Sequence, residues 1–432
     1  MNAIFFGIVL IAFLTTAWRE LSAPPVGDEP TAMAVLSSEM LGAASGAVEL
    51  ALGLVGAMTL FLGLMKVAEA GGLLTVIARL IRPLMTRLFP EVPPDHPAMG
   101  AMILNLSANS LGLGNAATPF GIRAMQELDR LNPRPGTATD AMALFLAINT
   151  SGVTLLPTGV IALRAAAGSD DPAAILPTTL FATLCATAAA ILAARLYQRL
   201  APLGPPGRVA AAPQRPDEQE ASAGTDLTAD AGAYPVWVSI LALGAVVALI
   251  PAAILWGERV SPWIIPSLML GFLLFGALRG VRVYEMFVEG AQEGFQVALR
   301  IIPYLVAILV AVGMFRASGA MDVMVGLLGG LTGRLGLPAE ALPMALLRPL
   351  SGSGAYGILA SIINDPAIGP DSYVGLLVST LQGSTETTFY VLAVYFGAVR
   401  VRRIRHTLGA ALTADLVAVI AAVAACGFLF AG

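Results

Sequence analysis

Apolar segments recur along this chain, with lengths close to the roughly 20 residues that a helix needs to cross a bilayer. They constrain its fold more than any other feature. Such segments, each expected to span or enter a membrane, are Ile4–Ala17, Val48–Met65, Ile175–Leu196, Val236–Trp256, Ile264–Leu278, Ile301–Phe315 and Leu408–Phe430. The first is expected to stay as an uncleaved span, because the Met-Asn-Ala start lacks a positive charge. The alternative is a secretory signal cleaved near Ser22.

The composition supports this interpretation. Of the 432 residues, 57% are hydrophobic and only 12% are charged, whereas soluble domains carry about 25% charged residues. The chain is therefore predicted to be an all-α polytopic membrane protein with lipid as a partner. Its net charge is −4, so nucleic acid is excluded as a partner. Cys185 and Cys426 form no paired motif and His96 and His406 lie far apart, so neither metal nor cofactor is expected.

Gly, Ser and Asn interrupt several of the remaining apolar segments. Met99–Gln126 and Ala341–Ile363 are predicted to be broken or re-entrant helices, which survive in lipid only where protein or water surrounds them. Asp140–Leu163 and Tyr373–Ala398 are apolar segments with polar residues near the middle or start. Gly72–Phe89 has apolar residues at helical spacing and arginines on its other face, which predicts an interfacial amphipathic helix.

A polar stretch, Pro202 to Gly232, is predicted to be a flexible linker that divides the chain. The expected organisation is an N-terminal membrane anchor with a lead-in segment over 1–47, a first repeat over 48–200, a cytoplasmic linker over 201–234, and a second half over 235–432 with two spans followed by a second repeat.

Similar markers occur in the same order in both halves. Glu69–Gly72 corresponds to Ala317–Ala320, Leu111–Asn115 to Ser351–Ala355, and Asn149–Thr154 to Gln382–Thr387. We call the last two segments the first and second polar knots. The markers predict an internal repeat.

Basic residues indicate how the two repeats are oriented. They follow the second span of the first half at Lys66 and Arg79, whereas in the second half they precede the corresponding span at Arg300 and cluster at 400–405. Because cytoplasmic loops are enriched in Lys and Arg, equivalent elements are expected to point in opposite directions. The sequence thus predicts two inverted-topology repeats.

Polar side chains inside membrane segments are costly, so they indicate a cavity or an interhelical contact. Broken helices of transporters use their free ends to hold substrates. The predicted substrate-binding residues are Asn105, Asn109, Asn115, Asn149, Thr150, Ser151, Thr154, Ser351, Ser353, Gln382, Ser384, Thr385 and Glu386. For a single Ser or Thr, close helix packing is the competing explanation. Glu386 is the acid that most favours a functional role.

Two enzyme motifs lack their context. Gly352–Gly357 matches GxGxxG, but no strand precedes it, so a dinucleotide site is not expected. The serines have no histidine and acid within plausible reach, so nucleophilic catalysis is not expected either. The chain is predicted not to be an enzyme.

Longer motifs carry a family resemblance. Asp95–Met102, Leu113–Gly121 and Ala147–Ser151 resemble spore maturation protein A, while Arg348–Gly354 and Gln382–Tyr390 resemble spore maturation protein B. The chain resembles a natural fusion of both, within the gate-domain superfamily that includes concentrative nucleoside transporters and ferrous-iron transporter B.

The resemblance implies a multi-pass protein of the bacterial cytoplasmic (inner) membrane built from two gate-domain repeats. It implies that the protein binds or transports a small polar solute, nucleoside-like or another metabolite, at a midplane site between the repeats, with a homo-oligomer as a further option. Gln382 to Glu386 resembles the Gln-x-Glu motif of nucleoside transporters but has a longer spacing. The alternative is a non-transporting membrane scaffold or regulator in envelope or spore maturation.

Overall fold

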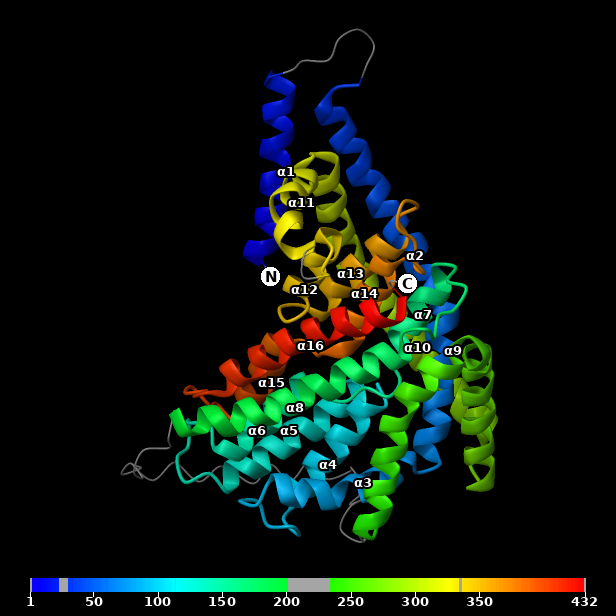
Figure 1. The fold of residues 1–432 in the computed structure, drawn as a ribbon, viewed down its shortest axis with the longest axis vertical. Helices are drawn as coiled ribbons and strands as arrows, with labels where there is room; N and C mark the ends of the chain where they lie inside the picture. Colours follow the sequence, from blue (N-terminus) through cyan, green and yellow to red (C-terminus); the bar gives the residue numbers. More distant parts are fainter. Residues whose placement is uncertain (1, 23–29, 113, 201–233, 334–335, 431–432) are drawn as a thin grey trace.

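The computed structural model describes residues 2–22, 30–112, 114–200, 234–333 and 336–430. Its helices confirm the all-α prediction (Figure 1). In chain order they are α1 (Asn2–Ser22), α2 (Ala32–Ala70), α3 (Leu73–Leu88), α4 (Pro97–Ser110), α5 (Gly114–Arg130), α6 (Asp140–Thr150), α7 (Thr158–Ala166), α8 (Leu176–Leu200), α9 (Val236–Leu278), α10 (Val283–Ala317), α11 (Ala320–Thr332), η2 (Ala339–Ala341), α12 (Leu342–Leu347), α13 (Gly352–Ile363), α14 (Tyr373–Ser384), α15 (Thr388–Ala398) and α16 (Thr407–Phe430).

Among the described residues, α1, α2, α8 and α16 are long and apolar enough to cross a membrane. One expectation needs correction. The spans expected over 236–256 and 264–278 do not form separate helices, because α9 continues through the Gly257–Ser261 stretch between them. Glu and Arg in that stretch are good helix formers, so polarity there does not end the helix. The expected domain boundary between residues 47 and 48 falls inside α2, and the predicted linker lies outside the described residues.

The segments 99–126 and 341–363 are broken helices, as predicted, and the structure shows breaks also in 140–163 and 373–398, which were expected only to carry polar residues near the middle or start. Breaks separate α4 from α5, α6 from α7, α12 from α13, and α14 from α15. Side-chain caps start several of these short helices: Thr139 accepts from the Met142 N–H at the start of α6, and Ser372 accepts from the Gly375 N–H at the start of α14. Such caps satisfy N–H groups that a helix start leaves free. The predicted amphipathic helix forms as α3, while its place at the membrane interface stays a prediction.

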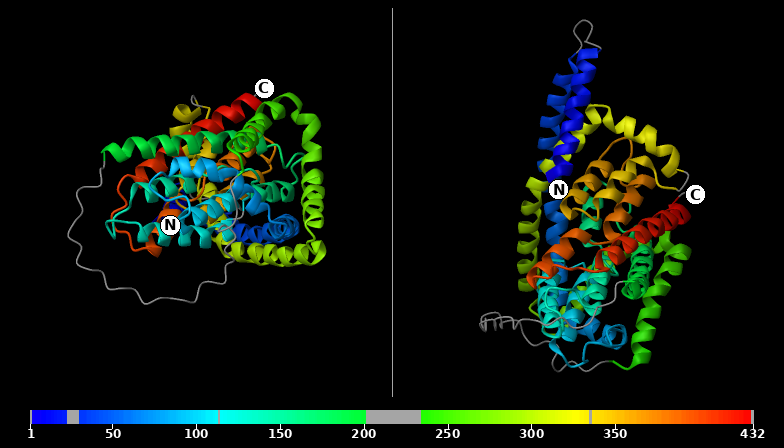
Figure 2. Two further views of the ribbon diagram at one scale, coloured as in Figure 1. Left: turned by 90° about the horizontal axis from the view of Figure 1, so that it is seen from below. Right: turned by 90° about the vertical axis from the view of Figure 1, so that its left-hand side faces the viewer.

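Two antiparallel helix pairs form the frame of the molecule. The long helices α2 and α10 pack along each other, and α8 and α16 lie side by side across the middle (Figures 1 and 2). A Cβ atom on Gly290 of α10 would lie 2.5 Å from the Leu62 carbonyl oxygen of α2. Glycine therefore permits the close backbone approach that stabilises helix pairs in lipid.

The two halves interlock through their cores. The core around α4, α5 and α6 includes Val391 and Phe396 from α15 of the second half. The core around α13 and α14 includes Ile161 and Leu163 from α7 of the first half. Each half therefore inserts its last short helix into the core of the other half, which places the two polar knots next to each other.

Candidate functional site

Breaks within each half are tied together by main-chain hydrogen bonds. In the first half, the Leu155 N–H donates to the Ser110 carbonyl oxygen at 2.8 Å, joining the α6–α7 break to the end of α4. In the second half, the Phe389 N–H donates to the Pro349 carbonyl oxygen at 3.0 Å. Main-chain N–H and carbonyl groups that the helix ends leave without a partner in their own helix thus bond to main-chain groups at the neighbouring break.

The polar knots meet directly across the halves. The Glu386 N–H donates to the Thr150 carbonyl oxygen at 2.8 Å. Around this bond the side chains of Asn149, Gln382 and Thr385 are buried, whereas the Glu386 carboxylate is 52% exposed. The structure therefore brings together the two segments that the sequence selects, with one exposed carboxylate at their junction.

Arg348 completes this junction and was not among the predicted site residues. Its guanidinium donates to the Thr385 carbonyl oxygen and to Thr387 Oγ1, the latter at 3.1 Å. Its Nη2 lies 3.8 Å from Glu386 Oε2, and the side chain is only 8% exposed. A buried cation thus supports the loop that presents Glu386.

The predicted asparagines connect α4 to this junction. Asn109 Nδ2 donates to Asn149 Oδ1 at 2.9 Å, so α4 is joined to the first polar knot. Asn105 Nδ2 donates to the Ala117 carbonyl oxygen at 2.8 Å and to the Tyr395 hydroxyl at 3.2 Å. Tyr395 belongs to α15, so this contact also crosses between the halves.

Several predicted hydroxyls bond their own helix. Thr150 and Ser151 both donate to the Ala147 carbonyl oxygen, and Ser384 donates to that of Leu381. These donors are already used, and close packing is the simpler explanation for them.

The remaining predicted residues differ in position. Ser351 caps α13 by accepting from the Gly354 N–H at 3.0 Å. Thr154 contacts the Gly152 carbonyl at 3.4 Å, and Ser353 is half-buried. The side chain of Asn115 lies outside the described residues.

Among the described residues, the buried polar atoms of this region that have no hydrogen-bond partner include Asn105 Oδ1, Gln382 Oε1 and Arg348 Nε. Buried polar groups are nearly always paired, so each such atom requires an explanation. A ligand with both donors and acceptors is one explanation.

Arg348 and Asp415 are the functional candidates that residue patterns missed. Both are charged residues in apolar surroundings, which is the signal that makes intramembrane charges functional candidates. Asp415 lies in α16, where its Oδ2 accepts from Thr388 Oγ1 at 2.7 Å. That bond connects α16 to the first residue of α15, next to the second polar knot.

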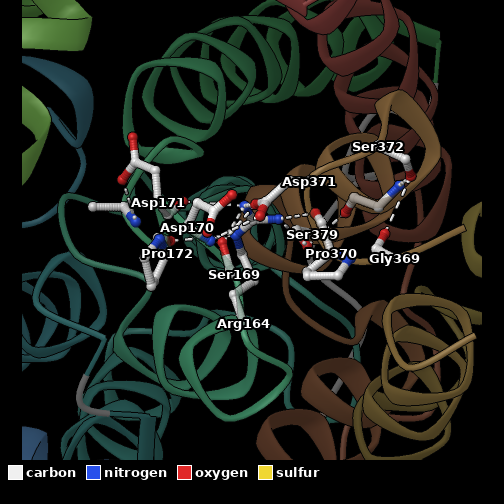
Figure 3. Close-up of polar contacts among 12 residues, drawn as sticks. Arg164, Ser169, Asp170, Asp171, Pro172, Gly369, Pro370, Asp371, Ser372 and Ser379 are labelled. Atoms are coloured by element: carbon white, nitrogen blue, oxygen red, sulfur yellow. Dashed lines mark hydrogen bonds and ion pairs between the residues drawn. The ribbon is translucent and has the colours of Figure 1, made fainter. Parts of the chain in front are cut away.

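A second polar cluster joins the halves beside the start of α8. The side chain of Arg164 is completely buried and lies between the loops 169–172 and 369–372 (Figure 3). It donates to Asp371 Oδ1 at 2.7 Å, to Ser169 Oγ at 3.0 Å and to the carbonyl oxygens of Pro172 and Pro370. One arginine therefore closes the contact between α7 and α14.

An analogous pair lies beside the start of α16. Arg405 Nη1 donates to Asp140 Oδ1 at 2.7 Å and to the Ala138 carbonyl oxygen at 3.0 Å. Main-chain bonds accompany it: the Ala138 N–H donates to the Arg403 carbonyl oxygen and the Arg402 N–H to that of Gly136, both at 2.9 Å.

The pKa values of two groups near this pair are shifted. Burial lowers the pKa of the His406 imidazole below its usual 6.5, the Arg405 charge adds to this shift, and Asp140 opposes it. Burial raises the pKa of the Glu91 carboxyl, and the Asp140 charge acts in the same direction.

A cavity of about 450 Å³ lies elsewhere, between α2, α10 and α13. Its lining includes Glu39, Glu49 and Arg316, and Arg316 is paired with Asp365 at 2.6 Å. None of the predicted site residues whose side chains the structure describes lines this cavity. In the part of the chain that the structure describes, no group of three or more His, Cys, Asp or Glu is arranged to hold a metal ion.

Apolar spans, broken helices and buried charges define an integral membrane protein of the multi-pass α-helical class. The chain matches the Gate family, described as nucleoside recognition, over residues 51–203 and 298–402. The protein belongs to this family.

Curated relatives agree with a fused organisation. The chain is 47% identical to spore maturation protein B of Bacillus subtilis (strain 168) over 166 residues, which are 38% of this chain and 92% of the relative. It is 47% identical to spore maturation protein A of the same organism over 154 residues, 36% of this chain and 79% of the relative. The inner membrane protein YjiG of Escherichia coli (strain K12) is 31% identical over 104 residues, 24% of this chain and 68% of the relative.

No solved structure matches the chain. The relatives and the apolar helices place the protein in the bacterial inner membrane as a multi-pass protein.

Proposed function

We propose that this protein binds a small polar solute, nucleoside-like or another metabolite, between the two polar knots and moves it across the inner membrane. The observation that carries the proposal is the junction of Glu386 with Thr150, where two broken helices meet beside an exposed carboxylate and a buried arginine. The family description, nucleoside recognition, supports the solute class.

Each side chain at the junction has a chemical role in this proposal. Glu386 accepts hydrogen bonds from solute hydroxyl or amino groups, and Gln382 Oε1 and Asn105 Oδ1 are buried acceptors that a solute donor would satisfy. Arg348 holds the loop that carries Glu386. Because the main-chain bond between the knots closes the junction, solute entry requires that bond to open, as expected when two halves move around a fixed site.

Glu386→Gln tests the binding step, because it keeps the shape and removes the charge. Purified protein is heated with adenosine, guanosine, cytidine or uridine, and a ligand that binds the native state raises the melting temperature. Wild type is expected to be stabilised by at least one nucleoside, and E386Q by none. E386Q alone should melt near wild type, because the carboxylate is half exposed.

The matched control is Glu340→Gln, an exposed acid in η2, which should respond to nucleosides as wild type does. Uptake of the same nucleoside into vesicles then separates binding from transport. Equal stabilisation of E386Q and wild type would remove Glu386 from the site. A loss of roughly 1–3 kcal/mol in the unliganded variant would instead identify it as a structural acid.

The second candidate is a non-transporting scaffold or regulator. The closed junction favours it, because the Thr150–Glu386 bond would also suit a fixed connection between the halves. In that case nucleosides do not stabilise the protein, and vesicles containing it take up no more solute than empty vesicles.

A further inference from the structure

Asp415 is a carboxylate enclosed within the helix bundle. It lies in α16, where it is 6% exposed. Its Oδ2 accepts from Thr388 Oγ1 at 2.7 Å, while its Oδ1 is buried and has no hydrogen-bond partner among the described residues. One of the two carboxylate oxygens therefore receives a hydrogen bond in the described structure, and the other does not.

An ionised carboxylate fits this environment poorly. Both of its oxygens are acceptors only, and an acceptor left unpaired in an apolar environment is costly. The protonated acid is neutral and avoids the much larger cost of a buried charge without a directly bonded cation. The burial of Asp415 and its single hydrogen bond, from a neutral hydroxyl, thus favour a proton on it in this conformation.

The charges around Asp415 do not replace that proton. Arg348 lies at the neighbouring polar knot, but its guanidinium donates to Thr385 and Thr387 and approaches Glu386. The helices packed against α16 are α6, α8, α14 and α15. Apart from Asp415, the titratable groups on these helices and on α16 itself are Asp140, Cys185, Arg195, Tyr197, Arg199, Tyr373, Tyr390, Tyr395 and Cys426. Of these, Asp140 pairs with Arg405.

A metal cation fits less well than a proton. Hard cations take six or more oxygen ligands, whereas the described contacts of Asp415 supply its own carboxylate and the Thr388 hydroxyl.

We infer that Asp415 is a proton-binding site that couples proton movement to the opening of the second polar knot. Thr388 follows the knot directly and Arg348 bonds the knot itself, so displacement of residues 385–387 changes the Thr388–Asp415 bond and the position of Arg348. When the knot moves away and water enters, the carboxylic O–H bond breaks and the proton passes to water. Reprotonation accompanies closure. The coupling to solute rests on the proposed function, whereas the bound proton does not.

Infrared spectroscopy of the purified full-length protein in lipid tests the inference directly. A protonated carboxylic acid has a carbonyl stretching band separate from that of a carboxylate. At neutral pH, wild type is expected to show this band, and Asp415→Asn is expected to lose it while retaining helical content by circular dichroism. If D415N does not fold, Asp415→Glu provides the same test through a shifted band.

Glu386→Gln and Glu340→Gln are the matched controls, and both should keep the band. Loss of the band in E386Q, retention of the band in D415N, or absence of the band in wild type would each overturn the inference. So would disappearance of the band on adding sodium at constant pH, which would show that a cation replaces the proton. If the Asp415 band is present but no nucleoside raises the melting temperature, only the proposed function is contradicted. If a nucleoside raises the melting temperature but the Asp415 band is absent, only this inference is contradicted.

Discussion

The Arg164–Asp371 and Arg405–Asp140 pairs join the same two halves at opposite ends of the α8–α16 pair, but they do so differently. At the first, a completely buried arginine side chain bonds both loops. At the second, main-chain bonds between residues 136–138 and 402–403 accompany the ion pair. Contacts built from main chain tolerate side-chain changes, whereas a contact built on one buried charge depends on its partner.

The largest expected difference between the two ends is their side of the membrane. Acids such as Asp170 and Asp171 surround the first pair, and Arg400, Arg402 and Arg403 surround the second. Because basic loops stay in the cytoplasm, the first end is predicted to be periplasmic.

With Cys185 and Cys426 replaced by Ala, a cysteine at Asp170 should react with a membrane-impermeant maleimide in intact cells. A cysteine at Arg402 should react only after permeabilisation. Labelling of both positions in intact cells contradicts this topology, and with it the inverted-repeat prediction.

The next effect concerns stability. Asp371→Asn removes the carboxylate paired with the completely buried Arg164, which keeps its bonds to Ser169, Pro172 and Pro370, and should lower the free energy of unfolding by about 3 kcal/mol. Asp140→Asn should cost about 1 kcal/mol, because Arg405 is not completely buried and main-chain bonds also join the halves at this end. Unfolding of both variants in detergent, followed by circular dichroism, measures the difference. Equal losses in the free energy of unfolding would show that the two ion pairs contribute equally to stability.

The smallest effect is a pH dependence confined to the second end. The pKa of His406 is lowered in the folded protein, so below pH 6.5 the unfolded chain binds a proton that the folded chain does not. Stability should therefore fall as the pH drops from about 7 through this range. His406→Gln should reduce that slope in thermal melts, while D371N should leave it unchanged. An unaltered slope in H406Q would exclude His406 as its source.

The helix breaks were predictable from sequence, because Gly, Ser and Asn interrupt otherwise apolar segments. Leu111–Asn115 lies at the break between α4 and α5, whereas Ser351–Ala355 begins at the last residue of the break before α13 and continues into that helix. Whether the repeats are inverted stays a prediction. The continuity of α9 was not predictable from polarity, because Glu and Arg occur in helices and loops alike.

In the candidate site, too, some contacts were predictable from the sequence and others were not. The proximity of the polar knots follows from their matching places in the two halves, and the Glu386–Thr150 bond agrees with it. The Thr388–Asp415 and Asn105–Tyr395 contacts join residues distant in sequence. No local pattern specifies such pairings, although an isolated charge in an apolar segment is a usable signal.

The exchange of α7 and α15 between the cores has a consequence for the order of synthesis. When α4, α5 and α6 have entered the membrane, the side chains of α15 that complete their core have not yet been translated. The core around α4, α5 and α6 therefore stays incomplete until most of the remaining chain has been synthesised. Final packing is therefore post-translational, and a ribosome that stalls before α15 leaves a product with an incomplete core. Covalent fusion ensures that the missing helix arrives on the same molecule that needs it.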